Sequence, residues 1–134
     1  MRTLAGWLGC LIVSLILVEP TSAQVLNLTR DAESGVDSLI AWERAWDRNC
    51  NTLPVTVTVT KNPDKGTISV VPGVASTIPE STPAAGDTSA CAGKPVTGNA
   101  IRYKSNAGFH GTDSVSYNVS SQPQRPRTIT INVK

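Results

Sequence analysis

The chain has 134 residues, with 12 Lys and Arg against 10 Asp and Glu, and its net charge is +2. This small charge excludes a strongly basic nucleic-acid-binding protein, and the length is that of one small domain. Ten glycines, nine prolines, and only three Trp, two Tyr and one Phe exclude a coiled coil, a collagen, a multi-spanning membrane protein and a two-domain enzyme. We therefore expect one domain without a nucleic-acid partner.

The first 23 residues have the pattern of a secretory signal peptide. Arg2 supplies a positive charge, residues 4–18 are an uncharged apolar run, and small residues follow up to Ala23, where cleavage is expected. The apolar run is shorter than the roughly 20 residues that a spanning helix needs. We therefore expect residues 1–23 to be a signal peptide and the protein to be periplasmic or secreted, with no membrane span after cleavage.

Cleavage after Ala23 would remove Cys10 and leave two cysteines, Cys50 and Cys91. An oxidising compartment favours one disulfide between them, which would close a loop of about 42 residues. A zinc site is disfavoured because His110 is the one histidine of the chain. A Cys–His nucleophilic pair is also disfavoured, because an exported thiol tends to oxidise.

Residues 37–48 are predicted to form a short helix. Asp37 can cap it, and Leu39, Trp42 and Trp46 recur at positions i, i+3 and i+7. A helix of this length persists only when it packs on something, so its apolar face would lie on the core. Alternatively, Trp42 and Trp46 would be exposed and would contact a partner or a sugar.

From residue 54 onward the sequence alternates between apolar and polar residues, which is typical of β-strands. The predicted strands are residues 55–60, 67–71, 100–104, 113–120 and 127–134. Residues 72–98 contain four prolines and four glycines, so we expect a long loop with little regular structure, tied down by the disulfide. The strands predict an antiparallel β-sandwich over residues 54–134, preceded by an N-terminal extension, residues 24–53, that contains the short helix.

One stretch, residues 103–119, carries a family signature. Its matching residues are Tyr103, Phe109, Gly111, Asp113 and Tyr117: a tyrosine strand, a Phe-x-Gly-x-Asp turn and a second tyrosine among alternating residues. This pattern resembles the bacterial immunoglobulin-like and cadherin-like modules of exported proteins, and the likeness extends over residues 54–134. A single module with two cysteines looks most like small secreted proteins of alphaproteobacteria. The resemblance implies a fold rather than a function, because such modules are spacers, adhesins and enzyme appendages alike.

Elementary chemistry gives each of these residues a structural role. Phe109 can anchor the turn in the core, Gly111 can adopt a backbone angle that other residues resist, and Asp113 can accept hydrogen bonds from turn amides. The spacing around Tyr117 matches a tyrosine corner, in which the hydroxyl bonds to upstream backbone. Antibody domains carry a core cysteine at the position of Val119, so the expected disulfide is not their inter-sheet bridge.

Catalytic and metal chemistry has little support in the sequence. His110, Asp113 and Ser114 lie close together, but a hydrolase triad needs a histidine that bridges nucleophile and acid, which crowding in one turn does not supply. Calcium prefers clustered carboxylates, whereas Asp64, Asp87 and Asp113 are scattered. We therefore expect no enzyme activity, no cofactor and no metal.

Together the patterns predict an all-β protein, an immunoglobulin-like antiparallel β-sandwich with a short N-terminal helical segment. We expect it to act as an exported non-catalytic binding or structural module. Its partner would be another protein or a cell-envelope component, contacted through loop 72–98 or segment 37–48. An alternative is a periplasmic or secreted inhibitor of a hydrolase that uses loop 72–98 as a plug. A third hypothesis is a calcium- or carbohydrate-binding adhesin.

Overall fold

The computed structural model describes residues 24–80, 89–120 and 125–134, and the predicted signal peptide lies outside them. The described residues are mostly β-strand, as their alternating pattern predicts, and they contain no α-helix. The elements are β1 (Leu26–Ala32), β2 (Ser38–Glu43), β3 (Ala45–Trp46), β4 (Thr52–Leu53), β5 (Val57–Lys61), β6 (Gly66–Thr77), the 3₁₀ turn η1 (Ser89–Cys91), β7 (Pro95–Ser105), β8 (Gly111–Val119) and β9 (Arg125–Val133).

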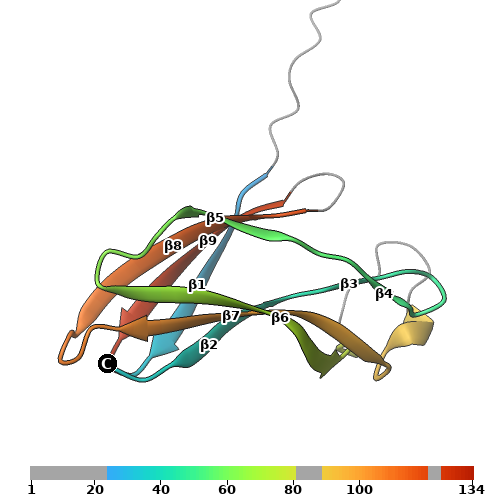
Figure 1. Ribbon diagram of the computed structural model, residues 1–134, viewed down its shortest axis with the longest axis horizontal. Helices are drawn as coiled ribbons and strands as arrows, with labels where there is room; N and C mark the ends of the chain where they lie inside the picture. Colours follow the sequence, from blue (N-terminus) through green and yellow to red (C-terminus); the bar gives the residue numbers. More distant parts are fainter. Residues whose placement is uncertain (1–23, 81–88, 121–124) are drawn as a thin grey trace, which may run out of the picture.

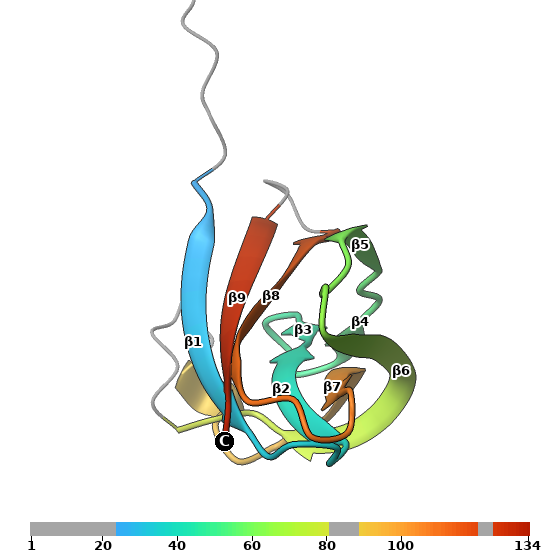
Figure 2. The same cartoon turned by 90° about the vertical axis from the view of Figure 1, so that its left-hand side faces the viewer.

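The strands form two sheets that lie over one another (Figure 1). One is four-stranded with the order β1-β9-β8-β5, and the other is three-stranded with the order β2-β7-β6. Figure 2 shows the two layers end-on. The pair β1–β9 is parallel, so the four-stranded sheet is mixed rather than wholly antiparallel as predicted. The short strands β3 and β4 pair with each other beyond one end of the layers.

The core lies between the sheets because each sheet has one apolar face. In β8 the side chains of Val115, Tyr117 and Val119 are buried, whereas the residues between them are half-exposed. This period of two places every second side chain on the same face. The buried cluster draws on both sheets and consists of Ala32, Ile40, Ile101, Tyr103, Val115, Tyr117, Val119, Ile129, Ile131 and Val133.

The helix predicted for residues 37–48 is wrong, because this segment forms β2 and β3. A β-bulge in β2 explains the misleading pattern. Leu39 pairs with Arg102 and Trp42 pairs with Ala100, and the pairing shifts by one residue between them. The extra residue brings two side chains that are three apart in sequence onto the same face of a strand. The helix-like spacing of the apolar residues is therefore the spacing of a bulged strand.

The prediction that residues 72–98 have little regular structure is also wrong at both ends of the segment. β6 continues through Thr77 and β7 begins at Pro95, and residues 74–77 pair with residues 95–98. The proline and glycine that suggested a loop lie at a bulge, where the register shifts between Val71 and Val74. Gly73 has a φ of 69° there, which glycine adopts without steric cost. The middle of the segment, 81–88, lies outside the described residues.

Residues 24–53, predicted as an N-terminal extension, contribute strands to both layers. β1 lies at the edge of the four-stranded sheet and β2 at the edge of the three-stranded sheet. Ala32 from β1 and Ile40 from β2 are part of the same buried cluster as the residues that follow position 54. Residues 24–53 therefore supply one edge strand to each layer.

The turn that joins β5 to β6 is fixed by a buried carboxylate. Asp113 is 5% exposed and accepts hydrogen bonds from the backbone amides of Asp64 (2.9 Å) and Lys65 (2.9 Å). It also accepts bonds from the Ser114 amide at 2.8 Å and from the Tyr103 hydroxyl at 2.9 Å. Burial acts to raise the pKa of Asp113, but these hydrogen bonds outweigh it and hold the pKa below its ordinary value of 3.8.

We predict that Asp113→Asn lowers the free energy of unfolding at pH 7 by about 1–3 kcal/mol, because an amide cannot accept all four bonds. The pKa of Asp113 is depressed in the folded state, so its stabilisation is present above the unfolded value and is lost as the pH falls through the folded value. Urea unfolding of both proteins between pH 5 and about pH 2 should show the stability difference shrinking. A difference that stays constant over this range would contradict the assignment.

Candidate functional site

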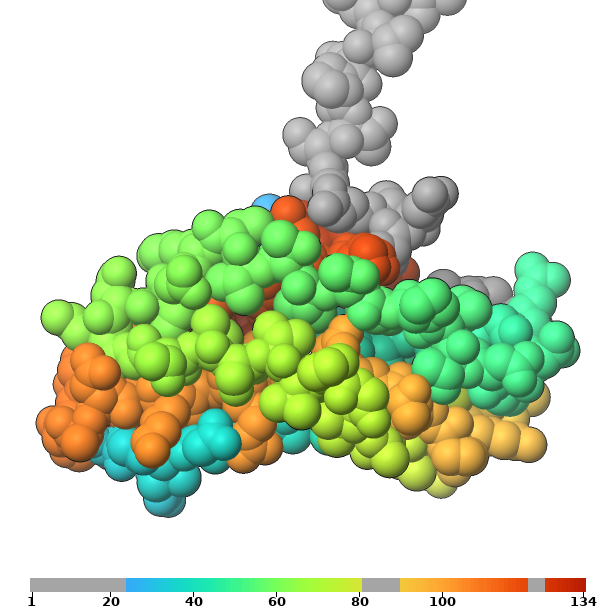
Figure 3. All heavy atoms as spheres, viewed as in Figure 1, coloured from blue at the N-terminus to red at the C-terminus, as the bar shows by residue number. Residues whose placement is uncertain are grey.

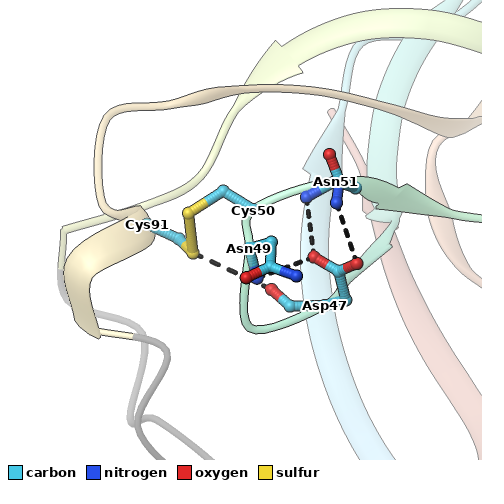
Figure 4. The surroundings of a disulfide bond; sticks show 5 residues. All are labelled: Asp47, Asn49, Cys50, Asn51 and Cys91. Carbon is cyan, nitrogen blue, oxygen red and sulfur yellow. Dashed lines mark hydrogen bonds between the residues drawn. A yellow bond between two sulfur atoms is a disulfide. The ribbon is translucent and has the colours of Figure 1, made fainter.

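A disulfide joins Cys50 to Cys91 at the end of the molecule where β3 and β4 lie (Figure 4). Their Cα atoms are 5.3 Å apart, within the usual range for a disulfide, and the predicted pairing is confirmed. Cys91 is fully buried at the end of η1, whereas Cys50 lies on the turn between β3 and β4. The bond is consistent with an oxidising compartment.

The turn that carries Cys50 is held by one carboxylate. Asp47 accepts hydrogen bonds from the Asn51 side-chain nitrogen at 3.0 Å and from the backbone amides of Asn49 (2.8 Å) and Asn51 (2.9 Å), as Figure 4 shows. These bonds, that of the Asn51 side chain foremost, lower the pKa of Asp47. Cys50 has a φ of 65°, a conformation that non-glycine residues rarely adopt. The turn and the disulfide therefore hold each other in place.

A small second core lies under the disulfide. Ile78, Cys91 and Val96 are buried there, and Trp46 and Cys50 pack against them. Two backbone hydrogen bonds tie the same region together, from the Ile78 amide to the Lys94 carbonyl at 2.9 Å and from the Gly93 amide to the Ile78 carbonyl at 2.8 Å. Trp46, a predicted partner contact, is therefore partly buried against this core.

Trp42, the other predicted partner contact, lies on the outer face of the three-stranded sheet, the face turned away from the core. It shares a cross-strand row with Ala100 and Val71. The Arg44 guanidinium carbon lies 6.0 Å from the centre of the Trp42 ring, within the range of a cation–π contact. The indole nitrogen is buried and has no hydrogen-bond acceptor among the described residues.

Gly98 makes this arrangement possible. A methyl group at Gly98 would lie 2.6 Å from the Glu43 carbonyl oxygen, 2.8 Å from the Arg44 Cβ and 3.1 Å from the Trp42 indole nitrogen. A side chain at position 98 would therefore displace the end of β2. The glycine admits Trp42 and Arg44 close against β7.

A hollow of about 230 Å³ adjoins this place, between the segment that leads into β5 and the bulge of β6. Its lining residues are all uncharged: Thr52, Leu53, Pro54, Val55, Pro72, Gly73, Thr97, Gly98 and Asn99. In Figure 3 the orange atoms of β7 show between the green segment before β5 and the yellow-green atoms of β6. Leu53 is 42% exposed at its rim, so the hollow offers apolar surface to a partner.

Behind Trp42, a second buried carboxylate lies in the core. Glu43 is 8% exposed and accepts hydrogen bonds from the Tyr117 hydroxyl at 2.8 Å and from Arg127 Nε at 3.3 Å. The tyrosine corner predicted for Tyr117 is therefore wrong in its acceptor, which is a carboxylate 74 residues away rather than nearby upstream backbone. Burial, together with the adjacent Glu43 carboxylate, raises the pKa of the Tyr117 hydroxyl.

The other residues singled out in the stretch 103–119 lie at the opposite end of the sheets from the disulfide. Phe109 is half-buried and packs against the main core. Gly111 has a φ of 137°, in the region that favours glycine. His110 is exposed, and the Ser114 hydroxyl accepts a hydrogen bond from Lys61 Nζ at 3.1 Å. The oxygens of Asp113 bind amides and a tyrosine, so this cluster is arranged as a structural turn.

Arg44 and Glu43 are two of the residues of this end that the sequence did not reveal. A single arginine beside a tryptophan has no diagnostic spacing. The core-facing position of Glu43 depends on the bulge in β2, which places it on the same face as Ile40, and the sequence does not indicate that bulge. Within residues 24–80, 89–120 and 125–134, no group of three or more His, Cys, Asp or Glu is arranged to hold a metal, and no helix is long and apolar enough to cross a membrane.

We predict that the double variant Cys50→Ser with Cys91→Ser loses up to about 4 kcal/mol of stability, because a disulfide that closes a loop of this length restricts the unfolded chain. Thermal or urea unfolding measures the loss. Wild-type protein treated with a dithiol reductant is the control and should unfold at the same midpoint as the variant. Two free thiols found by mass spectrometry of the untreated protein would overturn the assignment.

We predict that Tyr117→Phe costs about 1–3 kcal/mol, because it leaves a buried carboxylate oxygen with one bond fewer. A double-mutant cycle with Glu43→Gln separates this bond from the other contacts of the ring. The cycle should give a coupling energy of at least about 0.5 kcal/mol in urea unfolding. Additive effects of the two substitutions would show that the hydrogen bond does not contribute.

Comparison of the chain with models of protein families, with curated proteins and with solved structures gave no match. The likeness of residues 103–119 to immunoglobulin-like and cadherin-like modules therefore stays a prediction from the sequence. The case for a function rests on the residues and geometry of this chain.

Proposed function

We propose that the protein is an exported, non-catalytic binding module with an immunoglobulin-like β-sandwich fold, and that it binds another protein or a component of the cell envelope. The observation that carries this proposal is the construction of the disulfide end. There a disulfide, an Asp47-centred turn and a small separate core hold Trp46 and the β3–β4 turn in fixed positions beside a hollow. Recognition surfaces are commonly built from loops held on a rigid scaffold.

The fold assignment is supported by the two facing sheets of four and three strands. Sandwiches of this kind have about seven main strands and bury the inner faces of both sheets. The positions of Phe109, Gly111 and Asp113 at one turn agree with the family signature. The disulfide differs from the antibody pattern, because it lies outside the main core rather than bridging the two sheets through it.

The assignment to the periplasm or the outside of the cell is supported by two independent features. The leader pattern in residues 1–23 is that of a secretory signal. The disulfide needs an oxidising compartment to persist. The disulfide also fixes the β3–β4 turn and η1, at the end of the molecule proposed for binding. Without the disulfide, in the reducing cytoplasm, these parts would be less constrained.

The hydrogen bonding of the buried polar groups favours a binding role over a catalytic one, because these groups are bonded within the fold. The carboxylates of Glu43 and Asp113 are occupied by tyrosine hydroxyls and by backbone or arginine donors. The histidine of the chain is exposed on a turn. Groups that are bonded within the fold stabilise it and are not presented to a substrate.

The test is affinity capture from an envelope extract of the source organism by the mature, oxidised protein. We expect one partner to be retained stoichiometrically by the wild type and to be lost when Leu53→Asp places a charge on the rim of the hollow. The matched control is Leu26→Asp, which adds the same charge at a comparably exposed leucine of β1, in the four-stranded sheet. The proposed function would be contradicted if none of the three proteins retained a partner, or if all three retained it equally.

A hydrolase inhibitor is the second candidate, and the disulfide and backbone hydrogen bonds at the ends of the segment between β6 and β7 favour it. The disulfide and the backbone bonds between Ile78 and the residues Gly93 and Lys94 tie the described ends of this segment to each other and to the β3–β4 turn. An inhibitor of this design would form a 1:1 complex that suppresses the activity of the captured enzyme. Reduction of the disulfide would abolish the inhibition, whereas a captured partner without hydrolase activity would exclude this candidate.

A further inference from the structure

The guanidinium of Arg44 is a half-buried cation on the outer face of the three-stranded sheet. It lies over the Trp42 ring, and its NH1 donates a long hydrogen bond, 3.4 Å, to the Ser76 hydroxyl on β6. Burial lowers the pKa of Arg44. The side chain thus reaches from the end of β2 across Gly98 of β7 toward β6, and the contact with the indole and the bond to Ser76 hold the guanidinium between these strands.

No carboxylate of the described residues forms an ion pair with Arg44. The nearest acidic residue in sequence, Glu43, turns its carboxylate into the core, toward Tyr117 and Arg127. Asp37 is paired with Arg102 at 2.8 Å. A partly buried charge without a counter-ion carries a desolvation cost that an external anion would offset.

The outer face carries an excess of positive charge. β6 (Gly66–Thr77) and β7 (Pro95–Ser105) contain no Asp or Glu, and β7 adds Lys104 and the Asp37-paired Arg102 on the face that carries Arg44. Exposed aliphatic side chains flank the cations, since Leu39 is 45% and Val71 is 39% exposed. The face therefore complements a ligand that combines negative charge with apolar groups.

An acidic peptide segment fits this surface better than an acidic polysaccharide. A sugar ring would stack on an open aromatic face, but Arg44 covers the Trp42 ring and the indole nitrogen lies against Gly98. A planar guanidinium suits the two oxygens of a carboxylate. Aliphatic side chains of a peptide would contact Leu39 and Val71, which a polysaccharide could not match.

We propose that the outer face of the three-stranded sheet binds an acidic segment of a partner protein, with Arg44 receiving one of its carboxylates. This inference rests on the proposed function, because it names the class of partner that such a module takes. Glu or Asp side chains of the partner would pair with Arg44, and neighbouring aliphatic residues would cover Leu39 and Val71.

The test uses a labelled twelve-residue peptide of alternating Glu and Val, with an alternating Gln and Val peptide and polygalacturonate as the comparison probes. Fluorescence anisotropy on the mature oxidised protein should show binding of the acidic peptide alone. Arg44→Gln should raise its Kd at least about tenfold, because a partly desolvated charge pair is lost. Arg48→Gln removes the same charge from an exposed turn residue and should change the Kd by less than about twofold.

Equal weakening by the two arginine variants would overturn the proposal, since it would indicate unspecific attraction to a basic protein. Equal binding of the Glu and Gln peptides, or binding of polygalacturonate alone, would overturn it too. Should Arg44→Gln fold poorly, NMR titration of the wild type decides. The Trp42 indole and Arg44 Nε–H signals should move on addition of the acidic peptide, and unmoved signals would refute the site.

The two proposals fail in different ways. If the envelope partner is captured equally by wild type and Arg44→Gln, the binding function stands and the acidic-segment inference falls. If the wild type captures no partner from the extract but binds the acidic peptide through Arg44, the site stands and the proposed function falls.

Discussion

Two tyrosine–carboxylate hydrogen bonds cross the core in opposite directions, and the packing of the sheets depends on them. Tyr117 of the four-stranded sheet donates to Glu43 of the three-stranded sheet, and Tyr103 of the three-stranded sheet donates to Asp113 of the four-stranded sheet. A buried carboxylate is costly unless its oxygens are bonded. Each bond therefore fixes the position of one layer over the other, because sliding the layers would leave a charge without its partner.

The layers themselves could be predicted, because alternation of β-branched and polar residues is a local signal. It located β5, β8 and β9 within a few residues. β2 was missed because a bulge at residues 39–41 gives its apolar side chains a helical spacing. Likewise Pro72 and Gly73 indicated a loop, whereas they form the bulge of a strand that continues to Thr77. Bulges are set by pairing with a distant strand, so no local pattern distinguishes them.

In the candidate site, the sequence singled out only residues of types that are scarce in this chain, the cysteines and the tryptophans. Two cysteines in an exported chain allow one pairing, so the disulfide followed from arithmetic. Trp42 and Trp46 were noticed because aromatic residues are scarce here, but their surroundings depend on tertiary contacts. Gly98 illustrates the limit. The sequence pattern predicts a loop glycine at this position, whereas in the structure Gly98 leaves room for Trp42 and Arg44 against β7.

The opposite orientation of Glu43 and Arg44 links the core to the surface. Successive residues at a strand end point to opposite sides, so Glu43 enters the core while Arg44 remains on the outer face. Tyr117 and Arg127 then satisfy the Glu43 carboxylate, which leaves it unable to neutralise its neighbour. The bond that aligns the two sheets therefore also leaves a cation unpaired outside. An ion pair between Glu43 and Arg44 would neutralise this cation. The fold prevents that pair by placing the two side chains on opposite faces of the sheet.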